Sequence, residues 1–196
     1  MATQINRVTG VIFVPRADMT LVQSNPTEIR ELDLNQWRLI LRDLDDDVDG
    51  RLWPDTHSHN EDVIVGGEIT PLVKQPTTRQ LVMWAGAVGD YLPIHYDKDF
   101  AQSRGLSGVI VHGQLVGAFL GQLITDWIGE QGRVRKLSCN YKGMNYPGEA
   151  LTCKGKVTKK YVEDEHHYVE CSLWAENSKG DKTASGKAIV ILPSRG

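Results

Sequence analysis

The strongest pattern of apolar positions lies in the middle of the 196-residue chain. Residues 111–129, VHGQLVGAFLGQLITDWIG, are apolar on nearly every side for about five helical turns. A helix that exposes only one face to the core shows a narrower apolar stripe. The pattern therefore predicts a helix that is surrounded by other structure.

Two shorter helices are predicted before this central one. An apolar stripe indicates a helix at about residues 78–89, which either Thr77 or Thr78 can cap. The stripe consists of Leu81, Trp84, Ala85 and Val88. Asp97 can cap a second helix that passes through Phe100 and Arg104.

From Arg133 onward the pattern changes to strands. Four stretches alternate in polarity or are rich in β-formers, and the turn-like segments NYPGE, EDE and NSKGD separate them. The stretches are RKLSCNYKG, EALTCKGKVTKKYV, HHYVECSLWAEN and KTASGKAIVIL, and residues 65–73 predict an earlier strand. One buried helix, short helices before it and antiparallel strands after it predict an α+β fold in which a sheet wraps a helix.

The first sixty residues differ in character, and the join is predicted near Glu61–Gly67. This part is acidic and irregular, with a short strand at 11–15 and a helix at about 33–44. That helix would present Leu34, Trp37, Leu41 and Leu44 on one face. We therefore divide the chain at 61/62, into an extension (1–61) and a folded unit (62–196).

Composition excludes several classes of protein. A net charge of -3 and a pI near 6.1 argue against a protein that coats nucleic acid or an anionic membrane, since both need a basic face. The three cysteines are odd in number and lack CxxC spacing, so we expect reduced strand residues. The N-terminus shows no targeting pattern and the apolar run at 11–14 is too short to span a bilayer, so the expected compartment is the cytoplasm.

The candidate chemistry lies in the segment GDYLPIHYDKDFA, residues 89–101. Asp90 and His95 are an acid and an imidazole five positions apart, and Pro93 between them cannot continue a helix. A turn at Pro93 could aim both side chains at one water molecule. Carboxylates and imidazoles exchange protons readily in water, so the pair suits acid–base catalysis.

The start of the central helix adds a third component. The N–H of Gly113, just inside the helix, has no partner within it and lies at the positive end of the dipole. It could stabilise an oxyanion, and glycine permits close approach. Gly113, Gly117 and Gly121 also recur every four residues, which predicts close packing against a sheet or a partner helix, with backbone approaching backbone.

The stretch AGAVGDYLPIHYDKDFA followed by GVIVHGQL resembles the hydratase motif of MaoC-like hot-dog proteins, which include (R)-specific enoyl-CoA hydratases and 3-hydroxyacyl dehydratases. The resemblance covers about residues 62–196. It implies a hot-dog fold, at least a homodimer, and hydration or dehydration of an acyl thioester of coenzyme A or acyl carrier protein. It implies neither a metal nor a redox cofactor.

The resemblance also implies residue roles. Asp90 and His95 would be the acid–base pair and Gly113 the oxyanion donor. Residues lining the substrate would be Tyr91, Leu92, Pro93, Ile94, His112 and Gly121, with His112 also positioning the helix entrance. Two positions depart from the pattern: Leu92 stands where the family has asparagine, and Gly121 where the prototype hydratases carry serine.

Other clusters have weaker functional interpretations. The run at 43–50 echoes an EF-hand, but Thr56 stands where that loop needs glutamate, so a solvated acidic loop is favoured. His57 and His59 near Asp55 lack further ligands for a metal site. Four lysines either form a solvated face or meet coenzyme A phosphates, with solvation favoured: Lys154, Lys156, Lys159 and Lys160.

Two functional hypotheses remain open. Residues 1–61 resemble the N-terminal region of a tailed-phage structural protein, which has no chemistry assigned to these residues and is unlike any MaoC-like protein. The first hypothesis is therefore a hydratase or dehydratase carrying an accessory extension. The second is a non-catalytic assembly or acyl-thioester-binding protein that uses the hot-dog unit as a scaffold.

Overall fold

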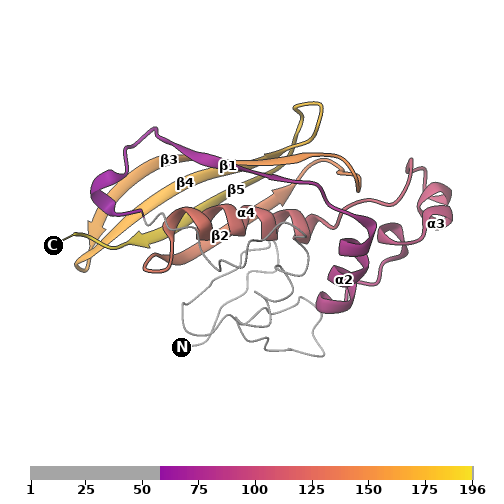
Figure 1. The fold of residues 1–196 in the computed structure, drawn as a ribbon, viewed down its shortest axis with the longest axis horizontal. Coiled ribbons are helices and arrows are strands. Elements are labelled where there is room, and N and C mark those ends of the chain that lie inside the picture. The colour runs from indigo at the N-terminus through magenta and orange to yellow at the C-terminus, as the bar shows by residue number, and fades with distance from the viewer. Residues whose placement is uncertain (1–57, 196) are drawn as a thin grey trace.

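The computed structural model describes residues 58–195 of the chain. The strand, the helix and the acidic loop predicted before residue 58 lie outside the described residues. Figure 1 shows the described part as one curved sheet with a long helix across it and shorter helices at one end.

A single antiparallel sheet contains five strands in the order β1-β3-β4-β5-β2. β1 spans Glu68–Lys74, and β2 spans Arg133–Tyr141. β3, β4 and β5 span Leu151–Glu163, His166–Glu176 and Lys182–Leu192. The four strands predicted after Arg133 and the earlier one near 65–73 are therefore all confirmed.

The long helix α4, Gly113–Ile128, lies against one face of this sheet and contacts all five strands (Figure 1). Its apolar side chains are buried almost without exception, as a helix surrounded by structure requires. The buried set is Leu115, Val116, Phe119, Leu120, Leu123, Ile124 and Ile128. The prediction of an interior helix at 111–129 is confirmed.

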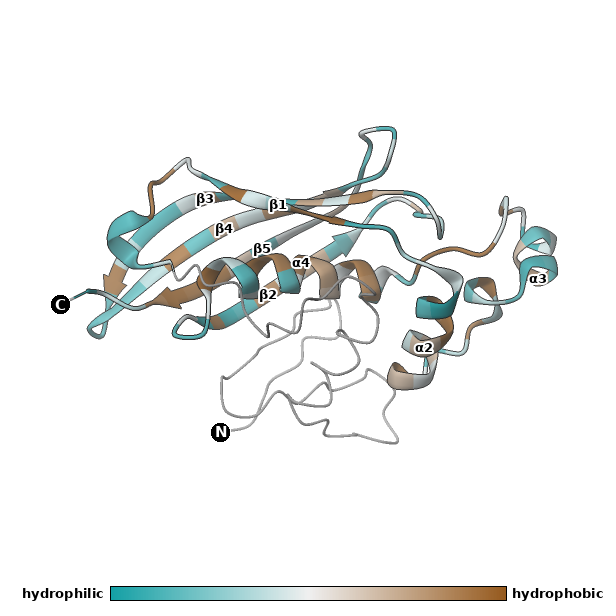
Figure 2. Ribbon diagram, viewed as in Figure 1, coloured by the Kyte–Doolittle hydropathy of each residue, from teal (hydrophilic) through white to brown (hydrophobic). Residues whose placement is uncertain are grey.

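The inner faces of the strands complete the core. β4 alternates cleanly, so that Val169, Cys171, Leu173 and Ala175 are buried while the residues between them are partly exposed. Figure 2 shows the same alternation of hydrophilic and hydrophobic residues along the strands. The three cysteines are free and buried on β2, β3 and β4, as expected.

The shorter helices gather near the start of α4 (Figure 1). α2 spans Thr78–Val88, and Thr77 caps it in a reciprocal capping box with Gln80. α3 spans Lys98–Ser103, and the Asp97 side chain accepts from the Phe100 N–H. The 3-10 turn η2, Pro93–His95, lies with these helices, whereas the 3-10 turn η1, Asn60–Asp62, lies at the other end of the sheet (Figure 1).

The α+β fold with a sheet around a central helix is confirmed, but one detail of the glycine stripe is wrong. Side chains, rather than another backbone, occupy the space beside these glycines. The ring of Tyr141 covers Gly113 and Gly117, and Leu137 lies against Gly121. Within residues 58–195 no helix is both long and apolar enough to cross a membrane.

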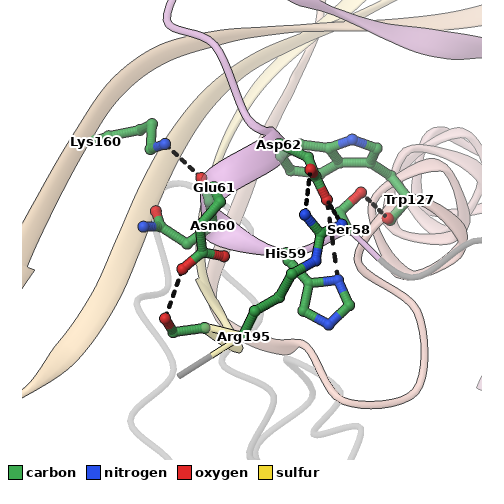
Figure 3. A network of polar contacts seen from close by, with 9 residues as sticks. Ser58, His59, Asn60, Glu61, Asp62, Trp127, Lys160 and Arg195 are labelled. Atoms are coloured by element: carbon green, nitrogen blue, oxygen red, sulfur yellow. Dashed lines mark hydrogen bonds and ion pairs between the residues drawn. The ribbon is translucent and has the colours of Figure 1, made fainter.

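A polar network holds residues 58–63, the entry segment, against the sheet (Figure 3). Lys160 on β3 donates to two carbonyls of this segment, Asn60 O at 2.5 Å and Val63 O at 2.7 Å. Ser58 Oγ donates to Trp127 O, 2.7 Å away in the last turn of α4. The entry segment is therefore tied to the end of α4 opposite Gly113.

The C-terminal residues bind the same segment. Asn60 N–H donates to Pro193 O at 2.9 Å, and Arg195 makes a two-pronged ion pair with Asp62. Such forked pairs fix orientation as well as adding energy. The two ends of the described chain thus meet on one side of the sheet.

The Lys160 contacts lead to a stability prediction. Lys160→Met should lower the free energy of unfolding by about 1–3 kcal/mol, because it removes charged hydrogen bonds to two carbonyls. Lys159→Met is the matched control, since Lys159 is 61% exposed and its ion pair with Glu170 measures 3.9 Å. It should change stability by about 0.5 kcal/mol or less. Urea unfolding followed by tryptophan fluorescence measures both, and equal effects would contradict the assignment.

Candidate active site

Asp90 owes its position to the way α2 ends. Gly89 adopts the left-handed conformation, with φ 71°, and its N–H bonds Ala85 O at 2.8 Å. Glycine reaches this conformation without a Cβ clash, so the helix stops and the chain reverses. Asp90 comes directly after this reversal and is half-buried.

The chain turns a second time before His95. Leu92 is extended, as a residue before proline must be, and Pro93 opens the 3-10 turn η2. The His95 N–H bonds Leu92 O at 3.1 Å and the Asp97 N–H bonds Pro93 O at 2.8 Å. The predicted turn between the acid and the imidazole is present.

His95 is held in one tautomer. Its Nδ1 lies 2.8 Å from Ile110 O, and a carbonyl can only accept, so Nδ1 carries the proton. The neutral ring therefore keeps its lone pair on Nε2, where it can take a proton. The backbone fixes the same pair of segments, because the Ile110 N–H donates to Ile94 O at 3.1 Å.

His112 touches both members of the pair. Its ring stacks on His95 with centroids 3.7 Å apart and an angle of 19° between planes. Its Nε2 lies 3.4 Å from Asp90 O, a long contact that places the proton on Nε2. His112 is almost fully buried, at 1% exposure, and its Nδ1 has no hydrogen-bond partner within residues 58–195.

Asp90, His95 and His112 thus form one cluster. A carboxylate oxygen of Asp90 and one ring nitrogen of each histidine all lie within 4.8 Å of one another. Three such groups could also be considered as metal ligands. A metal ion binds imidazole in the ring plane at about 2 Å. The His95 and His112 rings are stacked nearly parallel, so their lone pairs cannot both point at one ion at that distance. The arrangement therefore suits proton exchange better than metal binding.

The start of α4 completes the site. Gly113 follows His112 directly and is the first residue of α4, whose N-terminus has no side-chain cap. The first N–H groups of a helix have no partner within it and carry the positive end of its dipole. An oxygen that gains negative charge beside the Asp90–His95 pair would be stabilised there.

The sequence of the described domain matches a known family. Residues 64–177, more than half of the chain, match the family described as the MaoC like domain. This chain belongs to the MaoC-like dehydratase family. The match spans the strands β1 to β4, the central helix and the whole Asp90–His95–His112 cluster.

Curated relatives of this MaoC-like domain are partial or distant. It is 25% identical over 144 residues to the (R)-specific enoyl-CoA hydratase of Rhodospirillum rubrum, covering 70% of this chain and 94% of that protein. It is 36% identical over 73 residues to the fatty acid synthase beta subunit TOXC of Cochliobolus carbonum. That match covers 36% of this chain and spans only 4% of the length of the synthase subunit.

Solved structures confirm the hot-dog fold. The (R)-hydratase PhaJ1 of Pseudomonas aeruginosa superposes with a TM-score of 0.64 at 22% identity, covering 70% of this chain and 86% of that one. The (R)-hydratase of A. caviae gives 0.62 at 22% identity, covering 68% and 99%. At this identity the likeness establishes the fold.

The other residues expected to line the substrate are spread more widely. Tyr91 and Leu92 are exposed at the surface beside Asp90, while Pro93 and Ile94 are half-buried in η2. Gly121 lies two turns, about 12 Å, along α4 from Gly113. A Cβ added there would lie 3.3 Å from Leu137.

Sequence reasoning missed two components of the site in this MaoC-like domain. Ile110 contributes only a carbonyl, so its side chain gave no sign of the role. Tyr141, at the end of β2, covers Gly113, and the strand pattern predicts only its place in the sheet. The spacing of the glycines was the available signal, because it leaves room for a large side chain.

Burial affects the chemistry of the cluster through His112. The pKa of His112 lies at about 4, below its ordinary 6.5, chiefly because burial penalises the imidazolium and secondly because His95 is adjacent. The contact with Asp90 O and the Asp90 charge act in the opposite direction. His112 is therefore neutral near pH 7.

This depressed pKa predicts a pH-dependent stability. Between about pH 6.5 and 4 the unfolded chain takes up a proton at His112 that the folded protein does not, so stability should fall as the pH falls through this window. In His112→Leu, the free energy of unfolding should fall by on the order of 2–3 kcal/mol less than in the wild type over this pH range. Urea unfolding at several pH values between 7 and 4 measures it.

The matched control for this experiment is Val116→Ala, a change of another buried residue on α4. It should lower stability by a similar amount at every pH, because it removes no titrating group. If the wild-type and His112→Leu curves ran parallel from pH 6.5 to 4, the assigned pKa would be wrong.

Proposed function

We propose that this protein interconverts a trans-2-enoyl thioester and a 3-hydroxyacyl thioester by acid–base catalysis. The observation that supports this most directly is the clustering of the Asp90 carboxylate and the His95 imidazole beside the uncapped start of α4. Membership of a family whose relatives include an (R)-specific enoyl-CoA hydratase supports the same reaction.

In the proposed hydration, a water molecule lies between the Asp90 carboxylate and His95 Nε2. The pair takes a proton from water as the water oxygen forms a bond to C3 of the enoyl group. The electrons of the C2–C3 double bond move toward the thioester, whose oxygen becomes negative beside the Gly113 N–H. The pair then returns a proton to C2, and the reverse sequence is dehydration.

The surrounding residues prepare this pair for the reaction. Asp90 Oδ1 lies 3.4 Å from the Leu92 N–H, which helps to orient the carboxylate. The Ile110 carbonyl keeps the lone pair of neutral His95 on Nε2, and neutral His112 supports the ring without competing for charge. Only water and protons are exchanged, so we propose no metal or redox cofactor.

We further propose that the acyl group is carried by coenzyme A or acyl carrier protein, and that the working unit is at least a homodimer. One structural neighbour with a TM-score of 0.58 is a chain of the ChsH1–ChsH2 complex of Mycobacterium tuberculosis. Within the described sheet, the outer strands β1 and β2 each have one neighbour. Their free edges suit joining of sheets across subunits.

Single substitutions at the pair test the reaction. Asp90→Asn and His95→Gln should each lower kcat on crotonyl-CoA by about 100-fold or more, because each removes a proton-transfer group. Loss of absorbance of the enoyl thioester measures the rate. Asp99→Asn is the matched control, since Asp99 is an exposed carboxylate on the neighbouring α3 and should retain the wild-type rate.

Wild-type protein that left enoyl thioesters of several chain lengths unchanged would favour the alternative, a non-catalytic assembly or acyl-thioester-binding protein. Full activity in Asp90→Asn would show that the reaction does not depend on this carboxylate.

A further inference from the structure

On the side of α4 that faces β2, the Tyr141 side chain fills the space beside Gly113, the proposed oxyanion donor. A Cβ added to Gly113 would lie 3.0 Å from ring carbons of Tyr141, and one added to Gly117 would overlap its phenol oxygen. Tyr141 therefore lies along one full turn of α4, starting from its first residue. Leu137 continues this wall beside Gly121.

The loop after β2 holds Tyr141 at the catalytic end of the helix. The Asn145 carbonyl accepts from the Val111 N–H at 2.8 Å, between Ile110, which binds His95, and His112, which stacks on it. At the start of this loop, the Lys142 N–H donates to Thr183 O at 2.8 Å. These hydrogen bonds hold the end of β2, and with it Tyr141, next to the segment that contacts the acid–base pair.

Tyr141 is nevertheless reachable from solvent. The residue is 43% exposed, although its ring lies against Gly113 and its hydroxyl against Gly117. Burial of the phenol raises its pKa, so the hydroxyl is neutral and the residue acts there as an uncharged wall. A ligand that approaches Gly113 would meet this ring next.

We propose that Tyr141 limits the length of the acyl chain that the site accepts. This inference rests on the proposed function, in which the thioester oxygen docks at Gly113, and it adds that the acyl chain runs from there along α4. One helical turn is about 5.4 Å, which is the reach of only a few carbon atoms. The Tyr141 ring fills this first turn on the side of α4 that faces β2, so an acyl group of more than a few carbon atoms that starts at Gly113 needs the volume that the ring occupies.

The test is binding of saturated acyl thioesters, which have no double bond to hydrate. An open apolar channel binds longer chains more tightly, because each added methylene buries more apolar surface. Wild-type protein should instead bind butyryl-CoA at least tenfold more tightly than decanoyl-CoA. Tyr141→Ala should reduce this preference at least tenfold, as measured by isothermal titration calorimetry.

Three further variants separate chain-length selection from a structural role. Tyr141→Phe keeps the ring and should keep the preference, and Tyr141→Leu keeps apolar bulk in the strand and should give an intermediate value. Met144→Ala changes an exposed residue of the same loop and should leave the preference unchanged. The leucine variant provides the answer if the alanine variant does not fold.

The proposal fails if Tyr141→Ala and Tyr141→Leu keep the wild-type ratio, if wild-type protein binds decanoyl-CoA as tightly as butyryl-CoA, or if it binds neither. Failure of the proposed function has a different result. If only the proposed function fails, butyryl-CoA still binds with the preference that depends on Tyr141, but crotonyl-CoA is not hydrated.

Discussion

The candidate site depends on one junction between two segments, the turn at Pro93 and the strand-like stretch that leads into α4. Two hydrogen bonds form this junction. The Ile110 carbonyl accepts a hydrogen bond from His95 Nδ1–H, and the Ile110 N–H donates to the Ile94 carbonyl. Through this junction a ring nitrogen of His95 lies within 4.8 Å of a carboxylate oxygen of Asp90 and of a ring nitrogen of His112, the residue directly before α4. Without it, three groups that arise in three different elements would have no common position.

Contacts with His95 and Asp90 help to explain why His112 can be buried at this place. His112 loses hydration and leaves Nδ1 without a partner among the described residues, which is costly. Its stack on His95 and its contact with Asp90 O offset part of that cost. Elsewhere in the fold, the contacts that bind the entry segment to β3, α4 and the C-terminal residues add stability.

Much of the described fold could be predicted from the sequence because its signals are local. The Thr77 cap, the apolar surround of α4 and the alternation in β4 each depend on near neighbours in the chain. The turn at Pro93 followed from proline geometry, and it carried the prediction that Asp90 and His95 would meet. The Ile110 carbonyl and the Tyr141 ring could not be found in this way, because each reaches the site through long-range packing.

The two departures from the family pattern have different physical consequences. Leu92 replaces a polar side chain, yet its contact with Asp90 Oδ1 comes from the main-chain N–H, which any residue other than proline supplies. Gly121 lies where a Cβ would come within 3.3 Å of Leu137, so a serine there would require this side chain to move. The absence of a side chain at Gly121 and the bulk of Leu137 and Tyr141 on β2 therefore belong to one packing solution. In that arrangement β2, rather than α4, provides the side chains that fill the space beside the N-terminal half of α4.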